Sequence, residues 1–363
     1  MKNLKYFFLL LGLWLATSLP ITDGNSAQEE KRYDQLTSIV AHNSYTNKKA
    51  GWHRYRQQNL TVKEQLEHGA RGLTFDIHSL KNEIKLCHNK CLGPFGFQRD
   101  FISGLKTMAG YDPGYQRFKD VLKIINDWLD QPKNRNVIVT LFIKINFHYP
   151  DADYRLATDE FHINQKIFKP EYKQNNNNQW QTLKWMRDNN KRIVIFYEDK
   201  WNPPHTQDLT NMFYAWNHII ESHYGETERP QDICIQRKES KKICLKKFGA
   251  LCKNRKLLML NFFDHPASES RAKSVNSYAS LRKAISDCKS HNFFQNKKPN
   301  FITLDFVDHG DAIRLMHNLN TSENLTDFIT NFKPEAKVTN KKPKSSLWWR
   351  TASALHRYWR HRR

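Results

Sequence analysis

Three short stretches decide how this chain folds: AHNSY at residues 41–45, RGLTFDIH at 71–78 and LCHNKC at 86–91. In the first stretch His42, and in the last stretch His88, closes an apolar, strand-like run. One imidazole can accept a proton while a second returns one, which is what phosphodiester cleavage by general acid–base catalysis requires. The pattern makes these two histidines candidate catalytic residues, although most of the 16 histidines are expected to be packed or solvated.

The arrangement of apolar and amphipathic stretches predicts the fold. Apolar β-type runs alternate with helical stretches, which favours a βα architecture. We expect an α/β chain with an irregular TIM-like (β/α) barrel as its single catalytic domain; a doubly wound open sheet is the alternative. Catalytic groups of such barrels lie at the C-terminal ends of strands, where His42, His78 and His88 fall. The expected strands are 36–41, 72–77, 84–87, 137–145, 192–197, 257–263 and 301–307, and the expected helices are 62–68, 116–129, 179–188, 208–222 and 277–288.

The first residues predict export. Two lysines precede an apolar run at 6–15, and small residues follow it, as in a signal peptide. The run is shorter than the roughly 20 residues of a membrane span, and an uncleaved signal anchor is the alternative. We expect a signal peptide at 1–18 (cleavage could extend to 27), a barrel at 30–330 and a basic tail at 331–363.

Six cysteines agree with export, because an even number in an exported chain favours disulfides over a metal site. A bond between Cys87 and Cys91 would hold the loop that carries His88. A zinc site is disfavoured because the other cysteines form no second compact pair. The remaining four could form two further bonds with the pairing left open: Cys234, Cys244, Cys252 and Cys288.

Taken in order, the motifs around His42, Asp76 and His88 resemble the X-domain of phosphatidylinositol-specific phospholipases C, and especially the secreted branch of PLC-like phosphodiesterases. The resemblance implies a barrel fold and phosphodiesterase activity, and it covers about residues 33–319. It continues through VIVTLFIK, WQTLKWMRDNNKRIVIF, FYAWNHIIESHYG, CIQRKES, LNFF and PNFITLDFVDHGD.

The resemblance also bears on metal use. Calcium prefers six to eight oxygen ligands, and the calcium-dependent members surround the first histidine with acids. Asn43 and Asp76 match two of those ligands, but Thr74 and Lys144 stand where two acids are expected. Metal-independent members carry a lysine at the position of Lys144 and an arginine at that of His78. We therefore expect no cofactor, and calcium independence. If His78 must be cationic, activity should favour mildly acidic pH, because histidine titrates near pH 6.5.

The resemblance implies a role for each site residue. His42 is the general base and His88 the general acid, and an acidic partner for His42 could come from the last strand as Asp305, which could instead be a capping carboxylate. Lys144 and His78 would stabilise charge on the phosphate, a contribution that is often the largest. The expected catalytic residues are His42, His88, Asp76, Lys144 and His78, with Asn43 and Asp305 binding substrate or orienting it.

Charge predicts a second property. The formal net charge is +22, and the tail at 341–363 is rich in Lys and Arg. Written as a helix, the tail places Trp348, Leu355 and Trp359 on one face. This pattern is typical of an interfacial helix on an anionic membrane, and a disordered basic tail is the alternative. No nucleic-acid-binding motif accompanies it, so nucleic acid is not the expected partner. We expect a monomer.

Two function classes remain. The first is an exported phosphodiesterase that acts on a phospholipid or a glycophosphodiester substrate. The second is a catalytically silent barrel that binds lipid or sugar phosphate in the same cleft. The presence of both His42 and His88 favours the enzyme, because a silent barrel could lose either one without a cost to folding.

Overall fold

The computed structural model describes the chain in separate stretches. The expected signal peptide, His88, Cys91 and the basic tail lie outside them, so the expected domain boundaries stay predictions. The described residues are 31–50, 56–80, 83–87, 116–146, 163–199, 208–224, 233–238, 257–264, 266–291, 294 and 296–330.

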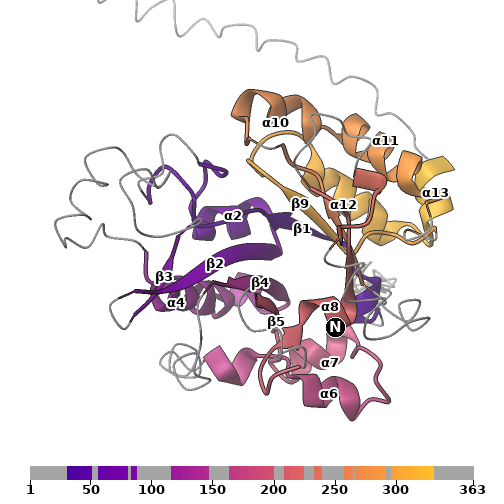
Figure 1. The fold of residues 1–363 in the computed structure, drawn as a ribbon. Helices are drawn as coiled ribbons and strands as arrows, with labels where there is room; N and C mark the ends of the chain where they lie inside the picture. Colours follow the sequence, from indigo (N-terminus) through magenta and orange to yellow (C-terminus); the bar gives the residue numbers. More distant parts are fainter. Residues whose placement is uncertain are drawn as a thin grey trace, which may run out of the picture.

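A curled sheet of parallel strands forms the centre of the described chain (Figure 1). Its parallel strands are β1 Ser38–Ala41, β2 Gly72–Leu80, β4 Val139–Ile145, β5 Ile193–Asp199, β6 Phe213–Tyr214, β7 Ile219–Glu221, β8 Leu257–Asn261 and β9 Phe301–Leu304. A further strand, β3 Glu83–Leu86, pairs antiparallel with β2. The order is β6-β5-β4-β2-β1-β9-β8-β7, so most parallel strands pair with the parallel strand that precedes or follows them in sequence.

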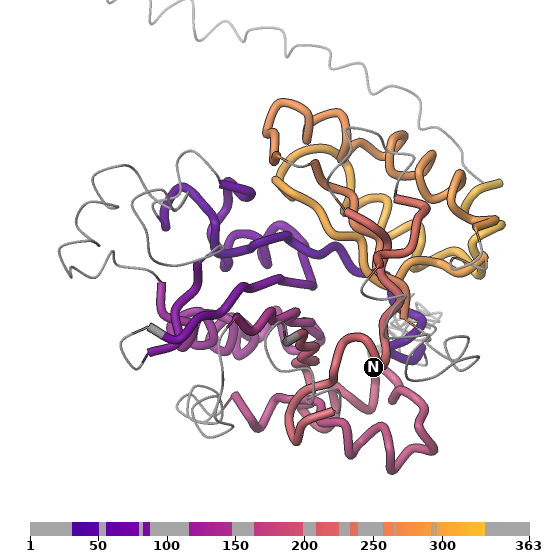
Figure 2. Tube along the Cα trace, viewed as in Figure 1, coloured from indigo at the N-terminus to yellow at the C-terminus, as the bar shows by residue number. Residues whose placement is uncertain are grey.

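This order is that of a (β/α) barrel. The first strand, β1, pairs in parallel with the last, β9, and in the tube trace the early, indigo part of the described chain runs beside its late, orange-yellow part (Figure 2). Within the described residues, β6 and β7 stand at the two ends of the sheet. The predicted irregular TIM-like barrel is confirmed as a curled half-barrel of parallel strands with helices.

Helices flank the sheet. Those after β8 gather beside β9 and β1, whereas α6, α7 and α8 lie at the other end of the molecule (Figure 1). No helix in the described stretches is both long and apolar enough to cross a membrane. The α-helices are α2 Val62–His68, α4 Phe118–Leu129, α6 Pro170–Gln174, α7 Leu183–Asp188, α8 Ala215–His218, α10 Glu269–Val275, α11 Tyr278–Cys288, α12 Ala312–Thr321 and α13 Leu325–Thr330, and short 3₁₀ turns occupy Tyr33–Gln35, Pro132–Asn134 and Ile163–Lys166.

Aromatic side chains fill the inside of the curl. The ring of Phe142 lies 4.9 Å from that of Phe301 and 5.6 Å from that of Phe196, measured between centroids. Alternate residues of the same strands, such as Leu141 and Ile195, face outward and join the core beneath the helices. Burying each such side chain contributes about 1.5–3 kcal/mol, and the aromatic layer gives the half-barrel an apolar floor.

Gly72 allows the first two strands to approach. An ideal Cβ at this position would lie 2.5 Å from Cγ2 of Val40, the residue that it faces in the register of β1 and β2. A side chain at position 72 would therefore separate the strands that carry His42 and Asp76. The glycine of the RGLTFDIH stretch has a packing role beneath the site.

Some predicted elements were wrong. The helix expected at 208–222 contains β6, the single turn α8 and β7 instead. Its apolar residues are buried on both faces, and period alone does not distinguish a buried strand from a buried helix. The strand expected at 84–87 is antiparallel, so it is no member of the parallel barrel. The strand expected at 301–307 ends at Leu304, and Phe306 adopts a left-handed backbone with φ of 47°.

The expected disulfides are partly visible. Cys234 and Cys288 form a bond that joins the segment 233–238 to α11. Cys87 is also disulfide-bonded, and the predicted partner Cys91 lies outside the described residues. Within the described stretches no cysteine is a free thiol.

Candidate functional site

A cavity of about 290 Å³ opens at the C-terminal ends of the parallel strands. This is the edge at which barrel enzymes carry their active sites. Its floor is apolar, with Phe142, Phe196 and Met259, and its walls are polar. The polar and charged lining residues are His42, Asn43, Gln57, Thr74, Asp76, Lys144, Glu198, Glu221, Arg237, Asn261 and Thr303.

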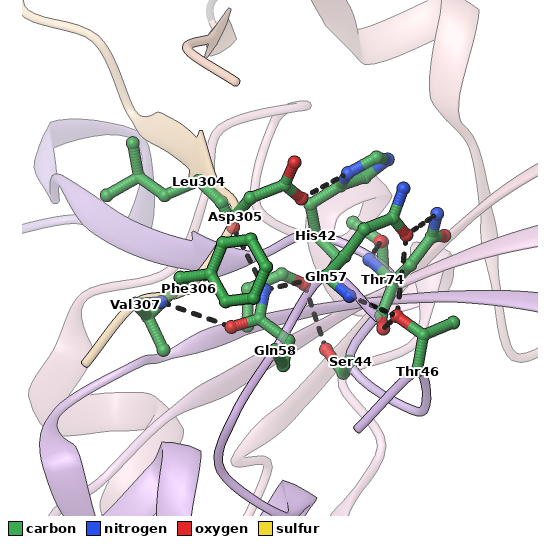
Figure 3. A network of polar contacts seen from close by, with 12 residues as sticks. His42, Ser44, Thr46, Gln57, Gln58, Thr74, Leu304, Asp305, Phe306 and Val307 are labelled. Atoms are coloured by element: carbon green, nitrogen blue, oxygen red, sulfur yellow. Dashed lines mark hydrogen bonds and ion pairs between the residues drawn. The ribbon is translucent and has the colours of Figure 1, made fainter. Parts of the chain in front are cut away.

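His42 and Asp305 each come directly after the last residue of one of two paired strands, β1 and β9. Nδ1 of His42 is 2.9 Å from Oδ1 of Asp305 (Figure 3). The Asp305 side chain is 5% exposed and that of His42 is 19% exposed. The imidazole also stacks on Phe263, with 3.9 Å between ring centroids. A carboxylate that accepts Nδ1–H fixes the ring orientation and leaves the lone pair on Nε2, the arrangement of a general base.

The turn after β1 places Asn43 beside the histidine. Asn43 has a φ of 42°, in the left-handed region that asparagine tolerates better than most residues. Its backbone N–H donates to Oγ1 of Thr74 at 2.6 Å, and its amide Nδ2 donates to Oε1 of Gln57 at the same distance. Thr74 thus supports the turn with its hydroxyl, at the position where a calcium-dependent site would use an acid.

Asp76 and Lys144 are paired residues on the adjacent strands β2 and β4, and both line the cavity. Burial lowers the pKa of Lys144, but the negative charges of Asp76 and Glu198 outweigh this, so the pKa is raised above its ordinary value. The ammonium group is therefore charged at every pH at which histidines titrate. It would compete with a cation for Asp76.

These residues do not fit a calcium ion. Calcium needs several carboxylate or carbonyl oxygens around one point, whereas here the ammonium-bearing Lys144 faces Asp76 on the adjacent strand and Thr74 carries only a hydroxyl. Across the part of the chain that the structure describes, no three His, Cys, Asp or Glu side chains are grouped so as to hold a metal.

His78 lies two residues after Asp76, inside β2 rather than at its end. It is buried, 9% exposed, and faces Lys85 in the register of β2 and β3. It is absent from the described lining of the cavity. The structure therefore brings His42, Asn43, Asp76 and Lys144 to one cavity, with Asp305 behind His42. His78 lies on the same strand as Asp76, two residues further on.

A second charged group, centred on Arg237, lines the cavity and was not predicted from the sequence. Its guanidinium is 2.9 Å from Oε2 of Glu221 and 3.5 Å from Oε2 of Glu198, and it stacks against the rings of Trp216 and Tyr224. Asn261 donates a further hydrogen bond to Glu221 at 2.7 Å. Burial is the main reason that the pKa of Glu221 is raised.

The Cys234–Cys288 bond explains how Arg237 reaches the cavity. Arg237 belongs to a short segment with no strand pattern of its own, three residues after Cys234. The disulfide ties this segment to α11, and Arg237 N–H donates to the Glu221 carbonyl at 2.9 Å. The sequence signals for this segment were Cys234 and the CIQRKES motif, and neither predicted that Arg237 would enter the cavity.

Comparisons with known proteins place the sequence in a family. A family model described as PI-PLC X 1 matches residues 29–320. The "PI-PLC X domain-containing protein At5g67130" of Arabidopsis thaliana is 24% identical over 79% of this chain, which spans 62% of that relative's length. The "PI-PLC X domain-containing protein 1" of Arthroderma benhamiae is 24% identical over 88% of this chain and 99% of its own. A protein of the same fungus, named "Uncharacterized secreted protein", is 24% identical over 57% of this chain and 41% of its own.

Solved structures with a similar course of the chain include two phospholipases. The phosphatidylinositol-specific phospholipase C from Listeria monocytogenes covers 80% of this chain and 94% of its own, with 14% identity and a TM-score of 0.46. A Ca²⁺-dependent enzyme of the same kind from Streptomyces antibioticus covers 80% of this chain and 98% of its own, with 14% identity and a TM-score of 0.42. Since the family model spans most of the sequence, this chain belongs to the PI-PLC X domain family.

Proposed function

We propose that this chain is an exported phosphodiesterase of phospholipase C type, which cleaves a phospholipid or a glycophosphodiester by two-histidine acid–base catalysis. The observation that carries the proposal is the His42–Asp305 pair at 2.9 Å, placed on the same cavity as Asp76 and Lys144. A base with a fixed tautomer and a permanent cation are what an attack on an anionic phosphodiester needs. Membership of the PI-PLC X domain family supports the reaction class.

In the proposed reaction, Nε2 of His42 removes the proton of a hydroxyl next to the phosphate. That oxygen forms a bond to phosphorus while the bond to the leaving alcohol breaks, and His88 protonates the departing oxygen. Lys144 stabilises the negative charge on the non-bridging oxygens, and Asn43 contributes a polar contact. Asp76 holds Lys144 in its charged form.

Arg237 and its two glutamates face the same cavity as Lys144. A guanidinium held between carboxylates offers both donors and acceptors, so this side of the cavity suits the hydroxylated part of a headgroup rather than its phosphate. We assign the phosphate to the side of His42 and Lys144.

Phosphorus NMR of mixed phospholipid vesicles tests the proposal. The protein is expected to convert one phospholipid class, and the product signal identifies the headgroup and whether a cyclic phosphate forms. Binding of lipid or sugar phosphate without any product, under conditions in which a known phospholipase C is active, would support the silent barrel instead.

Calcium chelation is expected to leave this turnover largely unchanged, because Lys144 occupies the place of an acidic ligand and repels a cation. The measurement is the initial rate with and without a chelator, followed by addition of calcium. A rate that collapses in chelator and returns with calcium would contradict our placement of Lys144 in the phosphate site.

Removal of residues 341–363 is expected to weaken binding to anionic vesicles while turnover of a soluble short-chain substrate stays the same. Each Lys or Arg adds about 1 kcal/mol near an anionic surface, and this tail lies beyond the 29–320 family match. Vesicle sedimentation at low and high salt measures the effect, which should shrink as salt screens the charges. Equal vesicle binding by the full-length and the truncated protein at low salt would show that residues 341–363 do not contribute to membrane binding.

A further inference from the structure

Gln58 joins the two strand ends that carry the His42–Asp305 pair. Its side chain is fully buried, with 0% exposure. Its amide Nε2 donates to the carbonyl oxygen of His42 at 2.8 Å and to that of Leu304 at 3.1 Å. Its Oε1 accepts the backbone N–H of Val307 at 3.1 Å. All three partners belong to the backbone on either side of the pair (Figure 3).

Neighbouring contacts give Gln58 little freedom to move. The N–H of His42 donates to the Leu304 carbonyl at 2.9 Å, which aligns the two strand ends. The N–H of Phe306 donates to the carbonyl of Gln57 at 2.7 Å. The loop that bears Gln58 thus lies against the C-terminal ends of the paired strands β1 and β9, beside the cavity.

The backbone beyond β9 needs such support. Phe306 has a φ of 47°, a left-handed conformation that is unfavourable for a bulky side chain. This turn directs Asp305 toward His42, since the strand ends at Leu304. The Asn276 amide supports this turn from one side by donating to the carbonyls of Asp305 and Phe306 at 2.8 and 3.1 Å. Gln58 supplies the bonds that join the turn to the backbone of His42, so its loss would loosen Asp305 relative to the imidazole.

We propose that Gln58 is a positioning residue, which acts through the backbones of His42, Leu304 and Val307 to hold His42 and Asp305 in register. This inference rests on the proposed function for its kinetic consequence only. Its geometric consequence, a stable Nδ1–H to carboxylate bond in the free protein, can be tested without any substrate.

Gln58→Met preserves the length of the side chain and removes all three hydrogen bonds. We expect kcat to fall roughly 10- to 10²-fold, the range in which small displacements of a catalytic group act, while KM changes less than twofold. The Nδ1–H signal of His42, which we expect to be protected from exchange in the native protein by its bond to Asp305, should broaden or disappear in Gln58→Met.

Gln65→Met is the matched control. Gln65 is also a glutamine with 0% exposure, and its Nε2 donates to two backbone carbonyls, those of Ser44 and Leu60, at 2.8 and 2.7 Å. Both variants should lower Tm by a similar amount. Only Gln58→Met should change kcat and the His42 signal. Equal kcat and equal His42 signals in the two variants would overturn the proposal.

Gln58→Glu provides a second variant if Gln58→Met does not fold. The introduced carboxyl group keeps the bond from Val307 and, when protonated, can donate to one of the two carbonyls. When ionised, the carboxylate has no proton to donate to the carbonyls of His42 and Leu304, and burial disfavours its negative charge. Its activity should therefore fall as pH rises, relative to the native profile. An unshifted pH profile at native kcat would contradict the assignment.

A double-mutant cycle with Asp305→Asn separates positioning from a general loss of packing. If Gln58 acts through the pair, the double variant should have about the same kcat as Asp305→Asn alone. Effects that multiply would show independent action and reject the proposal. If the native protein has no turnover at all, the proposed function fails, and the NMR comparison still decides the role of Gln58.

Discussion

Replacing His42 with alanine is expected to lower kcat by roughly 10²- to 10⁴-fold, the usual contribution of a general base. The residue stands at the cavity with its Nδ1 bonded to Asp305, so Nε2 is the nitrogen placed to accept a proton. The same loss is expected for His88→Ala, which removes the proposed acid. Steady-state kinetics on the lipid class identified by phosphorus NMR measure both.

The free energy of unfolding and the Asp305→Asn variant provide the controls for these two histidine variants. His42→Ala leaves the Asp305 carboxylate without its imidazole partner, which should cost about 1–3 kcal/mol of the free energy of unfolding. Asp305→Asn should lower kcat less than His42→Ala does, because it changes the orientation of the base and not its presence. Native kcat in either histidine variant would rule out the two-histidine mechanism.

The strand order and the first half of the site could be predicted from sequence because they depend on local patterns. Each apolar run that precedes His42 or contains Asp76 is a buried parallel strand, and such strands are continuous and apolar. Since the chemistry of a barrel gathers at one edge, the strand pattern placed His42 there, whereas Asp76 and Lys144 were assigned to the site through the family resemblance. In the structure, the register of β2 and β4 pairs Asp76 with Lys144.

The missed features depend on contacts that no local pattern encodes. Arg237 enters the cavity from a segment with no periodicity, held by a disulfide to α11, 54 residues away along the chain. Gln58 has its partners at Leu304 and Val307, on the far end of the sequence. The helix α12 was not predicted, although it buries Leu315 and Leu319. The polar groups that organise this site therefore required the three-dimensional structure.

The pH dependence of the reaction separates the roles of Lys144 and the histidines. Since Asp76 and Glu198 keep the pKa of Lys144 raised, its charge is retained well above neutral pH. A raised lysine pKa means that the charged form is favoured in the folded protein, and this contribution to stability is lost only as pH rises through that pKa. The limbs of the activity profile near neutral pH should therefore come from histidines.

Lys144→Met is expected to lower kcat by roughly 10²- to 10³-fold, the scale found when an electrostatic stabiliser of a transition state is removed. The change keeps the volume of the side chain but leaves Asp76 without the ammonium charge that it faces across β2 and β4. Lys144→Glu should be more damaging, because two carboxylates would then repel the phosphodiester. Initial rates with a soluble substrate measure both effects without interference from membrane binding.

Lys166→Met is the matched control for burial of a lysine. Lys166 is 7% exposed and pairs with Asp130 at 2.9 Å, away from the cavity. The Lys166→Met variant should be less stable than the native protein but keep the native kcat.

Addition of calcium to Lys144→Glu tests whether the acid restores a metal site. We expect no recovery, since Thr74 still supplies a hydroxyl where a second acid would be required, and its Oγ1 is engaged by the Asn43 N–H at 2.6 Å. Native kcat in Lys144→Met would show that the phosphate is not bound through Lys144, and recovery of Lys144→Glu with calcium would show that an acid at position 144 is enough to restore a metal site.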